Sequence, residues 1–441
     1  MDERLDAAQA AASSGHWSTV AHLLQEIVSQ QDGQGLDRLT QQRLINLALG
    51  CLSDGNFQTR WDISKVIPQL GAIALPALLH IVRTTDFDEE DWEYLWFAAR
   101  LVGEFDHPDA IATLLALLQS GTPELVQVAS DALANRGAVI VPDVTSLLSR
   151  PSARLGVAQT LAKIDHPSII EPLLVLVDDG VAEVRAIALE ALMRYSDDRI
   201  VSSLMRSLAD TSARVRQAAV TGLGLQAQRV SSQDMVPLIE PLLLDFNGQV
   251  GRQAAIALGR LRTIEALNAL DRAWRSPYLS EPLRHEIVQV MGQGQHEYAL
   301  LMLQGYLEEQ LGTTDVHAAP TQRLCHTIIA TLGRVESPML QPTATQILIE
   351  ILQVQPSISQ WPQLRQAIAF SLGQIGNSQA IEALIQLLAD EDTGVRLHAI
   401  AALKQIDPTN TRKRLEQLSQ DLSISPNLQQ GTAFALTEWS R

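Results

Sequence analysis

The chain has 441 residues, and its 33 Lys and Arg against 50 Asp and Glu give a net charge of −17. An apolar content of 46% is enough to bury a large core, which excludes a wholly disordered chain. The acidic balance argues against a nucleic-acid partner, because a phosphate backbone needs a basic stripe. Two cysteines exclude a disulfide framework. No apolar run reaches the length of about 18 residues that a transmembrane segment needs, and no signal peptide is evident, so we expect a cytoplasmic protein.

Residues 1–50 do not follow the pattern of the rest of the chain. Apolar residues at helical spacing predict helices there, on either side of a polar break at 31–35. Terminal units of repeat proteins are usually atypical, because one of their faces must meet water. We therefore predict a helical N-terminal cap over 1–50 and a repeat region over 51–441.

One apolar pattern recurs along the repeat region. In 184–192 the spacing places Val184, Ala188, Ala191 and Leu192 on one face of a helix. The same face returns every 28 to 41 residues, most often after 31. Its last apolar residue falls at Val102, Leu133, Leu161, Leu192, Leu223, Leu258, Met291, Leu332, Leu372, Leu403 and Leu436. A period near 31 fits one hairpin of two helices.

A first apolar helix, such as 169–177 or 380–388, precedes the repeated face, and an acidic turn lies between the two helices. Such a hairpin cannot bury its apolar faces alone, so neighbouring hairpins must stack. We predict an all-α fold, an alpha-alpha superhelix of about 11–12 helical hairpins in one solenoid. Two repeats are longer, with insertions around 308–320 and 354–362. Contact with a partner and simple tolerance of insertion both stay open for these loops.

The acidic turn, the Val-Arg pair after it and the Ala-x-x-Ala-Leu-Gly ending resemble the HEAT-like repeats of the phycobilisome-lyase family over about residues 60–437. The stretches 94–100, 178–179 and 253–261 are most similar to the cyanobacterial IscA-interacting HEAT-repeat proteins, which are relatives of the bilin lyase subunits. The resemblance implies a HEAT-repeat solenoid that has an A-type iron–sulfur carrier as its protein partner.

An arginine follows the first apolar position of the second helix in many repeats. These arginines are Arg154, Arg185, Arg216, Arg284, Arg365 and Arg396. A guanidinium placed after the acidic turn can bind an aspartate and free carbonyl groups there. We predict a structural ladder, interrupted at Gly251 and Cys325, with apolar residues in its place in the first two repeats.

The neighbouring positions of the second helices should face the concave surface. In the middle of the chain they gather Arg214, Arg252, His285, Arg323 and His326. A local positive patch on an acidic chain is a candidate site for an anion or an acidic partner. The alternative is that these are scattered, solvated side chains.

Metal and catalytic motifs are scarce. Cys325 and His326 are adjacent, so they diverge by about 100° on a helix and cannot both bind one ion. We expect no cofactor on the chain alone, and Cys325 could serve only an iron–sulfur centre shared with a partner, with Arg323 favouring its thiolate. A buried Cys is the alternative. His285-Glu286 and His296-Glu297 lie in one repeat, unlike the matched pairs of the HEAT-repeat enzymes that hydroxylate deoxyhypusine, so we predict no catalytic residue.

Aromatic residues concentrate at Trp92, Tyr94, Trp96 and Phe97, after the acidic stretch 86–91. Phe97 is expected in the core. Trp92 and Trp96 fall on the other side of the helix and have the composition of a protein-binding anchor, with burial in the core as the alternative.

These observations favour a non-catalytic scaffold that binds partner proteins on its concave face, with an A-type iron–sulfur carrier as the partner that the resemblance implies. The alternative is a phycobilin lyase or a bilin-handling chaperone acting on phycobiliproteins. Arg and His would then bind the bilin propionates, although lyases of this type usually work as two different subunits. A general adaptor with no cofactor is a third hypothesis.

Overall fold

The structure, a computed structural model, describes residues 2–29, 37–85, 92–229, 231–312, 318–355, 358, 360–421 and 423–439. The polar break at 31–35, the acidic stretch 86–91, and parts of both insertions (313–317, 356–357 and 359) lie outside the described residues. Within the described part of the chain all regular structure is helical.

The first thirteen α-helices are α1 (Asp2–Ser13), α2 (Trp17–Ser29), α3 (Arg38–Asp54), α4 (Phe57–Ile63), α5 (Leu75–Thr84), α6 (Trp92–Gly103), α7 (Pro108–Leu117), α8 (Pro123–Ala134), α9 (Val141–Thr145), α10 (Arg154–Lys163), α11 (Ile170–Leu176), α12 (Ala182–Leu192) and α13 (Asp198–Ser207). They are followed by α14 (Ala213–Leu225), α15 (Ser232–Ile239), α16 (Gly248–Leu261), α17 (Ile264–Trp274), α18 (Glu281–Gln293), α19 (Glu297–Leu311), α20 (Ala319–Gly333), α21 (Gln341–Val354), α22 (Pro362–Ile375), α23 (Ile381–Gln386), α24 (Thr393–Ile406), α25 (Pro408–Gln420) and α26 (Pro426–Trp439).

Short 3-10 helices extend or precede some of these α-helices. They are η1 (Ile67–Leu70), η2 (Ala72–Ala74), η3 (Gly137–Ile140), η4 (Ser146–Ser149), η5 (Pro151–Ala153), η6 (Pro167–Ile169), η7 (Glu240–Leu244), η9 (Ser378–Ala380) and η10 (Leu387–Ala389).

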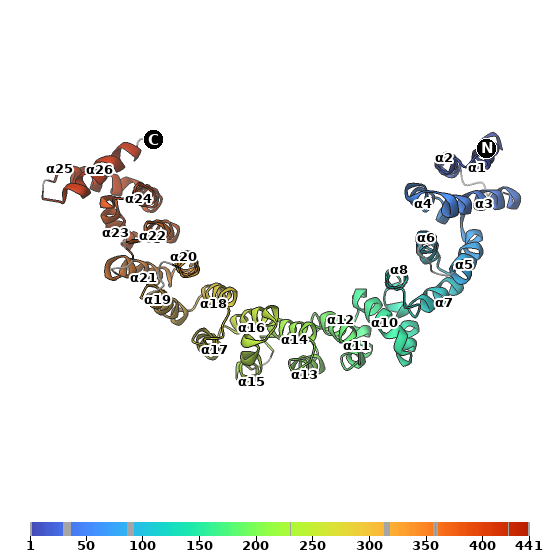
Figure 1. The fold of residues 1–441 in the computed structure, drawn as a ribbon, viewed down its shortest axis with the longest axis horizontal. Coiled ribbons are helices and arrows are strands. Elements are labelled where there is room, and N and C mark those ends of the chain that lie inside the picture. Colours follow the sequence, from blue (N-terminus) through green and yellow to red (C-terminus); the bar gives the residue numbers. More distant parts are fainter. Residues whose placement is uncertain are drawn as a thin grey trace. The chain divides into compact units, whose positions relative to one another are not determined.

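The chain divides into two compact units, Met1–Ser203 and Leu204–Arg441. In the first unit, consecutive helices pack as hairpins from α3/α4 to α11/α12, and in the second unit they do so from α15/α16 to α25/α26. The second helices of neighbouring hairpins also pack on each other, so that α14, α16, α18, α20, α22 and α24 form one layer of the second unit (Figure 1). We call this the second-helix layer, and α4, α6, α8, α10 and α12 form its counterpart in the first unit. The prediction of an all-α superhelix of stacked hairpins is confirmed.

The N-terminal helices α1, α2 and α3 pack against one another, and α2 also contacts α4. Residue 50 lies inside α3, so this helix crosses the boundary that the sequence suggested between the cap and the repeats. Within the described residues no single helix is long and apolar enough to cross a membrane. The pair Phe57–Leu70 and Ala72–Thr84 reaches that length and composition together, but it bends by 117° at its break.

The repeated apolar face forms the core, as its spacing predicts. Val184, Ala188 and Leu192 are at most 1% exposed in α12. The polar turn also sets where α24 begins, because Asp392 accepts a hydrogen bond from the Val395 N–H (2.9 Å) and so caps this helix. Apolar burial defines each hairpin, and it leaves the two outer faces of the hairpin to be covered by its neighbours.

Small residues allow the second helices to approach one another closely. A glycine near the end of one helix faces a residue of the next helix, in the pairs Gly103/Ala132, Gly224/Ala257, Gly259/Val290, Gly292/Thr331, Gly333/Ser371 and Gly373/Ala402. A Cβ atom on Gly333 would stand 2.6 Å from the Ser371 Cβ, and one on Gly373 would stand 2.9 Å from the Ala402 Cβ. Neither gap has room for a methyl group, so the spacing of the layer depends on these glycines.

We predict that Gly333→Ala lowers the free energy of unfolding by about 1–3 kcal/mol, because the added methyl group overpacks the contact with Ser371. The matched control is Gly305→Ala in α19, where an added Cβ has no atom within 4 Å. This control should stabilise the helix by about 0.5–1 kcal/mol, since alanine loses less backbone entropy than glycine. Urea titration of both variants measures the difference, and equal effects would contradict the close-approach argument.

Candidate functional site

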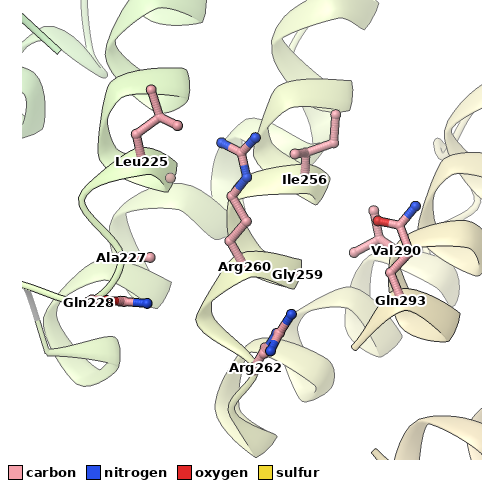
Figure 2. Close-up of a pocket in the computed structure, with 10 residues that line it drawn as sticks. Leu225, Ala227, Gln228, Ile256, Gly259, Arg260, Arg262, Val290 and Gln293 are labelled. Atoms are coloured by element: carbon pink, nitrogen blue, oxygen red, sulfur yellow. The ribbon is translucent and has the colours of Figure 1, made fainter. Parts of the chain in front are cut away.

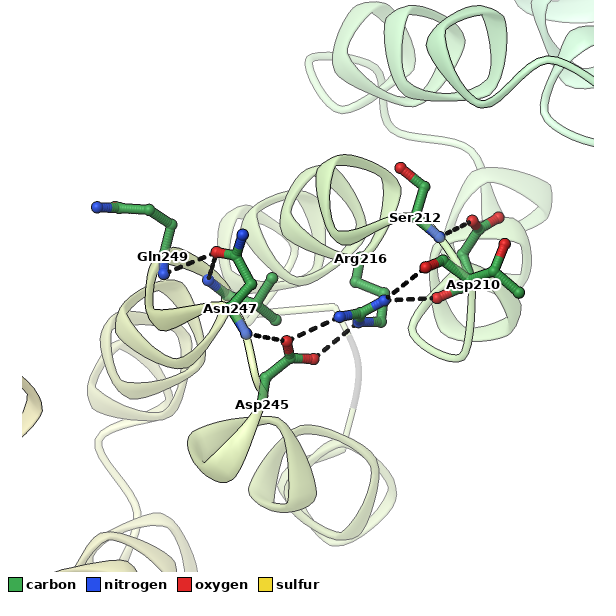
Figure 3. A network of polar contacts seen from close by, with 8 residues as sticks. Asp210, Ser212, Arg216, Asp245, Asn247 and Gln249 are labelled. Carbon is green, nitrogen blue, oxygen red and sulfur yellow. Dashed lines mark hydrogen bonds and ion pairs between the residues drawn. The ribbon is translucent and has the colours of Figure 1, made fainter. Parts of the chain in front are cut away.

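The arginine ladder lies along the turns of the hairpins and joins one repeat to the next. Arg216 of α14 donates two hydrogen bonds to the Asp245 carboxylate (both 2.7 Å) and one to the Asp210 carbonyl (2.8 Å) (Figure 3). Arg365 repeats the arrangement with Asp390, at 2.6 and 2.9 Å. Each arginine thus binds its own turn through a carbonyl group and the next turn through a carboxylate.

The other ladder arginines make part of this pattern. Arg154 binds the Leu148 carbonyl (2.9 Å) and the Asp179 carboxylate (3.1 Å). Arg185 and Arg396 bind the carbonyls of Asp179 and Asp390, at 2.8 and 2.7 Å. Arg284 binds the Trp274 carbonyl (3.0 Å) and lies over the Trp274 ring, 5.1 Å from its centroid.

The sequence analysis missed one member of the ladder, Arg60. It donates to the carbonyls of Leu52 (2.7 Å) and Ser53 (2.9 Å), and its other nitrogen binds Glu93 of the next hairpin (2.7 Å). Glu93 takes the place of the aspartate here and reaches Arg60 from inside α6. Because the partner carboxylate is not in the turn, the acidic-turn pattern gave no signal for this pair.

The Arg216 pair also shifts the ionisation of its carboxylate. Desolvation opposes ionisation of Asp245, but hydrogen bonds from Arg216 and from the Asn247 N–H outweigh it, so the pKa of Asp245 lies below its ordinary value. A carboxyl group with a depressed pKa in the folded state stabilises the fold above its unfolded pKa, about 3.9. That contribution is lost as the pH falls through the folded-state pKa.

We predict that Arg216→Ala lowers the free energy of unfolding at pH 7 by about 1–3 kcal/mol, because Asp245 loses its charged partner. The penalty should shrink as the pH falls below about 3.9, since protonated Asp245 no longer needs that partner. Urea unfolding between neutral and acid pH measures this. A penalty that stays constant over the whole range would mean that the arginine acts through packing alone.

The positions that were expected to form a positive patch, which we call the charged column, also have acidic partners. The charged column consists of Arg214, Arg252, His285, Arg323 and His326. Arg252 is paired with Glu286 (2.8 Å), and Arg323 is paired with Glu281 (2.9 Å). His285 lies 3.9 Å from the same Glu281 carboxylate and bonds the Thr327 hydroxyl at 2.9 Å. Arg214 and His326 are exposed. The two glutamates of α18 thus pair with two of the three arginines of the column and reduce the positive charge that it presents.

Cys325 lies in the core of the second unit rather than on a surface. It is 1% exposed, and burial raises the pKa of its thiol to about 12. The expectation that Arg323 favours a thiolate is therefore wrong, because desolvation keeps the thiol protonated. Within the described residues no group of three or more His, Cys, Asp or Glu is placed to hold a metal ion. A buried, protonated Cys325 therefore does not fit the role of a ligand to an iron–sulfur centre.

The two His-Glu pairs have contacts of their own. Glu286 binds Arg252, and His296 caps α19 by accepting the Tyr298 N–H at its Nδ1 (3.1 Å). His285, with Thr327, and Glu297, with Thr343, bond to other helices, so the two pairs make contacts between and at the ends of helices.

We predict that neither thiol of the folded chain reacts readily with a disulfide reagent at pH 8. Burial raises the pKa of Cys51 and of Cys325 to about 12, and only the thiolate is a nucleophile. Reaction should proceed at the rate of unfolding and accelerate in urea. Fast labelling in the native state, followed by mass spectrometry that finds Cys325 modified, would show that this thiol is accessible.

The most distinctive exposed surface of the first unit is aromatic. We define the aromatic surface as Phe57 and Trp61 of α4 with Trp92, Trp96 and Arg100 of α6. Phe57, Trp61 and Trp92 are 54%, 37% and 38% exposed, and Trp96 is half-buried. Phe97, in contrast, is fully buried, as the sequence predicts.

The aromatic surface is held together by ring contacts and a cation. Phe57 stacks on Trp61 with 6.5 Å between ring centroids, and it meets the buried Phe97 edge-on at 5.6 Å. The Arg100 guanidinium lies 4.8 Å from the Trp61 ring centre and 5.9 Å from that of Trp96. Its Nη1 is buried and has no hydrogen-bond partner. The surface thus combines exposed aromatic rings with a positive charge between Trp61 and Trp96.

Sequence reasoning found the α6 half of this surface and missed the α4 half. Phe57 and Trp61 are four residues apart and therefore share a helix face, which was the available signal. They belong to a helix of seven residues, Phe57–Ile63, which is shorter than the helices of the repeat pattern.

The stacked hairpins, their shared turns and their repeated core place this chain among the α-solenoid proteins, which present extended surfaces to other proteins. A family model described as HEAT repeats matches residues 141–224, 201–292 and 348–436, which is more than half of the chain. The chain belongs to the HEAT-repeat family.

No curated protein matches the sequence. Among solved structures, a Kap121p mutant is similar with a TM-score of 0.52 and 14% identity, over 91% of this chain and 49% of that chain. A chain in a Kap95p structure with RanGDP has a TM-score of 0.49 and 13% identity, over 95% of this chain and 60% of that chain. The chain thus spans less than two thirds of either structure.

The complex of CpcE and CpcF of phycocyanin lyase from Nostoc sp. is similar over 61% of this chain and 94% of that chain, with 18% identity and a TM-score of 0.30. A TM-score below 0.5 does not establish a shared fold. The Kap121p superposition therefore supports the fold, and it supports the fold alone.

Proposed function

We propose that this chain is a non-catalytic scaffold that binds a partner protein through the aromatic surface of its first unit. The observation that carries the proposal is the exposure of Phe57 and Trp61 on α4 and of Trp92 on the adjoining α6, with the Arg100 guanidinium over the Trp61 ring. Trp, Tyr and Arg are enriched among the few residues that carry most of the binding energy of protein interfaces. A contiguous exposed group of such residues is a typical protein-binding site.

The charged column of the second-helix layer is a weaker candidate for the docking site. The arginines of the charged column already bind Glu281 and Glu286, so a partner would have to compete with these ion pairs. The aromatic surface presents side chains to solvent instead, since Trp61 and Trp92 are 37% and 38% exposed. This difference favours the first unit as the docking site.

The partner we propose is an A-type iron–sulfur carrier in the cytoplasm. Support comes from the resemblance of 94–100, 178–179 and 253–261 to the IscA-interacting HEAT-repeat proteins. The first of these stretches belongs to α6 and includes Trp96 and Arg100. In this proposal the carrier keeps all ligands of its own cluster, because Cys325 is buried.

A second candidate function is the handling of a bilin. Arg100 between the rings of Trp61 and Trp96 combines aromatic faces with a positive charge. An open-chain tetrapyrrole has rings that stack on aromatic faces and propionates that bind guanidinium groups. The same surface would then hold a pigment rather than a protein.

We predict that Trp92→Ala weakens binding of a purified A-type carrier by about tenfold or more, as expected for an aromatic hot-spot residue. The matched control is Phe246→Ala, which removes a fully exposed aromatic side chain from the second unit. Isothermal titration calorimetry of both variants measures the effect. The urea midpoints should stay unchanged, because neither side chain belongs to the core.

The outcomes separate the two candidates. Wild-type chain that binds the carrier no more tightly than it binds an unrelated acidic protein would refute the carrier as partner. A visible absorption band on addition of a free bilin, lost in Trp61→Ala, would establish the pigment-handling function instead. Equal carrier binding by Trp92→Ala and Phe246→Ala would remove the aromatic surface from the proposal.

A further inference from the structure

The second unit has an open groove at the C-terminal ends of its second helices. A cavity of about 520 Å³ lies between the ends of α14, α16 and α18, and a second one of about 470 Å³ lies between those of α18 and α20. Arg262 and Gln293 line both cavities, so the two are adjacent. Figure 2 shows Arg260 and Arg262 at the end of α16, with Gln228 on one side and Gln293 on the other. We call this the arginine groove.

The arginines of the arginine groove have no ion-pair partner among the described residues of the second unit. Arg260 and Arg262 line the first cavity and Arg334 lines the second, and all three are exposed. Their side chains make no hydrogen bond or ion pair with another described residue. No carboxylate lines the first cavity, and Glu336 is the one carboxylate that lines the second. This is an unusual concentration of unpaired positive charge in a chain with a net charge of −17.

The backbone supplies an independent observation at the same place. Arg262 has a φ of 53°, in the left-handed region, where it ends α16. The corresponding end of α22 is Gly376, with a φ of 74°, which is the residue that this conformation favours. The arginine therefore occupies a position where glycine would be less strained, and its side chain lines both cavities. Strain of this kind concentrates at functional sites.

A second residue in the left-handed region has a side chain that bonds within the second unit, which provides a comparison for Arg262. Gln295, with a φ of 50°, accepts a hydrogen bond from the Ser337 N–H (3.2 Å) and thereby links two repeats. The Arg262 N–H caps α16 by donating to the Gly259 carbonyl (3.3 Å), but its side chain has no bond of this kind with another described residue. This contrast points to a ligand outside the unit as the partner of Arg262.

We propose that the arginine groove binds an extended acidic segment of a partner protein. Carboxylates of the segment bind Arg260, Arg262 and Arg334, and amide side chains such as Gln228 and Gln293 bind its backbone. Leu225, which is 53% exposed, and Ile256 give the first cavity an apolar wall. A segment with an aliphatic side chain between acidic residues therefore fits best. This surface lies in the second unit and does not depend on the aromatic surface of the first.

The test uses the full chain and a fluorescein-labelled peptide of about ten residues, with Leu flanked by Asp and Glu and with Gly and Ser at its ends. A second peptide has Asn and Gln in place of the acids. Fluorescence anisotropy should show binding of the acidic peptide only, and this binding should weaken as salt is raised from about 50 to 300 mM. Equal binding of both peptides, or no binding of the acidic one at low salt, would overturn the proposal.

Arg262→Gly is the decisive variant, because glycine relieves the backbone strain while it removes the guanidinium. We expect about tenfold weaker peptide binding and no decrease in the urea midpoint. Lys413→Glu in α25 controls for net charge against Arg262→Glu, and it should leave peptide binding within about twofold of wild type. If Arg262→Gly binds as wild type does, or if Lys413→Glu is as harmful as Arg262→Glu, the groove is not the docking site. Trp92→Ala should bind the peptide normally, so this result is separate from the test of carrier binding.

Discussion

The close approach of successive second helices is the constraint on which the rest of the structure depends. At Gly333 and Gly373 the neighbouring helix leaves no room for a Cβ atom, and the same holds at Gly103. Because packed interiors neither expand nor leave gaps, the small residues set the distance between one repeat and the next. The spacing of the turns, and therefore the reach of each ladder arginine to the next carboxylate, follows from that distance.

The arginine ladder works at the edge of the same stack. Where the packing brings two turns close, Arg216 and Arg365 each join a carbonyl of one turn to a carboxylate of the next. The stabilisation is electrostatic and directional, whereas the contact at the glycines is steric. Two different interactions thus hold α14 to α16 and α22 to α24, one along the helices and one along the turns.

Much of the fold could be predicted from the sequence, because an apolar face must recur at each hairpin for the stack to bury it. The ladder contacts of Arg216 with Asp210 and Asp245 follow from the same periodicity. The ion pairs of Arg252 and Arg323 could not be predicted from the sequence, because their partners lie 34 and 42 residues away on another helix. The burial of Cys325 depends on which face of α20 meets its neighbours, and a single thiol carries no periodic signal for that.

The pairing of a glycine on one repeat with a different small residue on the next has a consequence for assembly. The two faces of a repeat are unlike, so the contact is heterologous, and a heterologous contact that does not close into a ring can continue without limit. Each repeat therefore presents one face that fits the repeat before it and an unlike face that fits the repeat after it, so a hairpin placed between two others must match both of its neighbours.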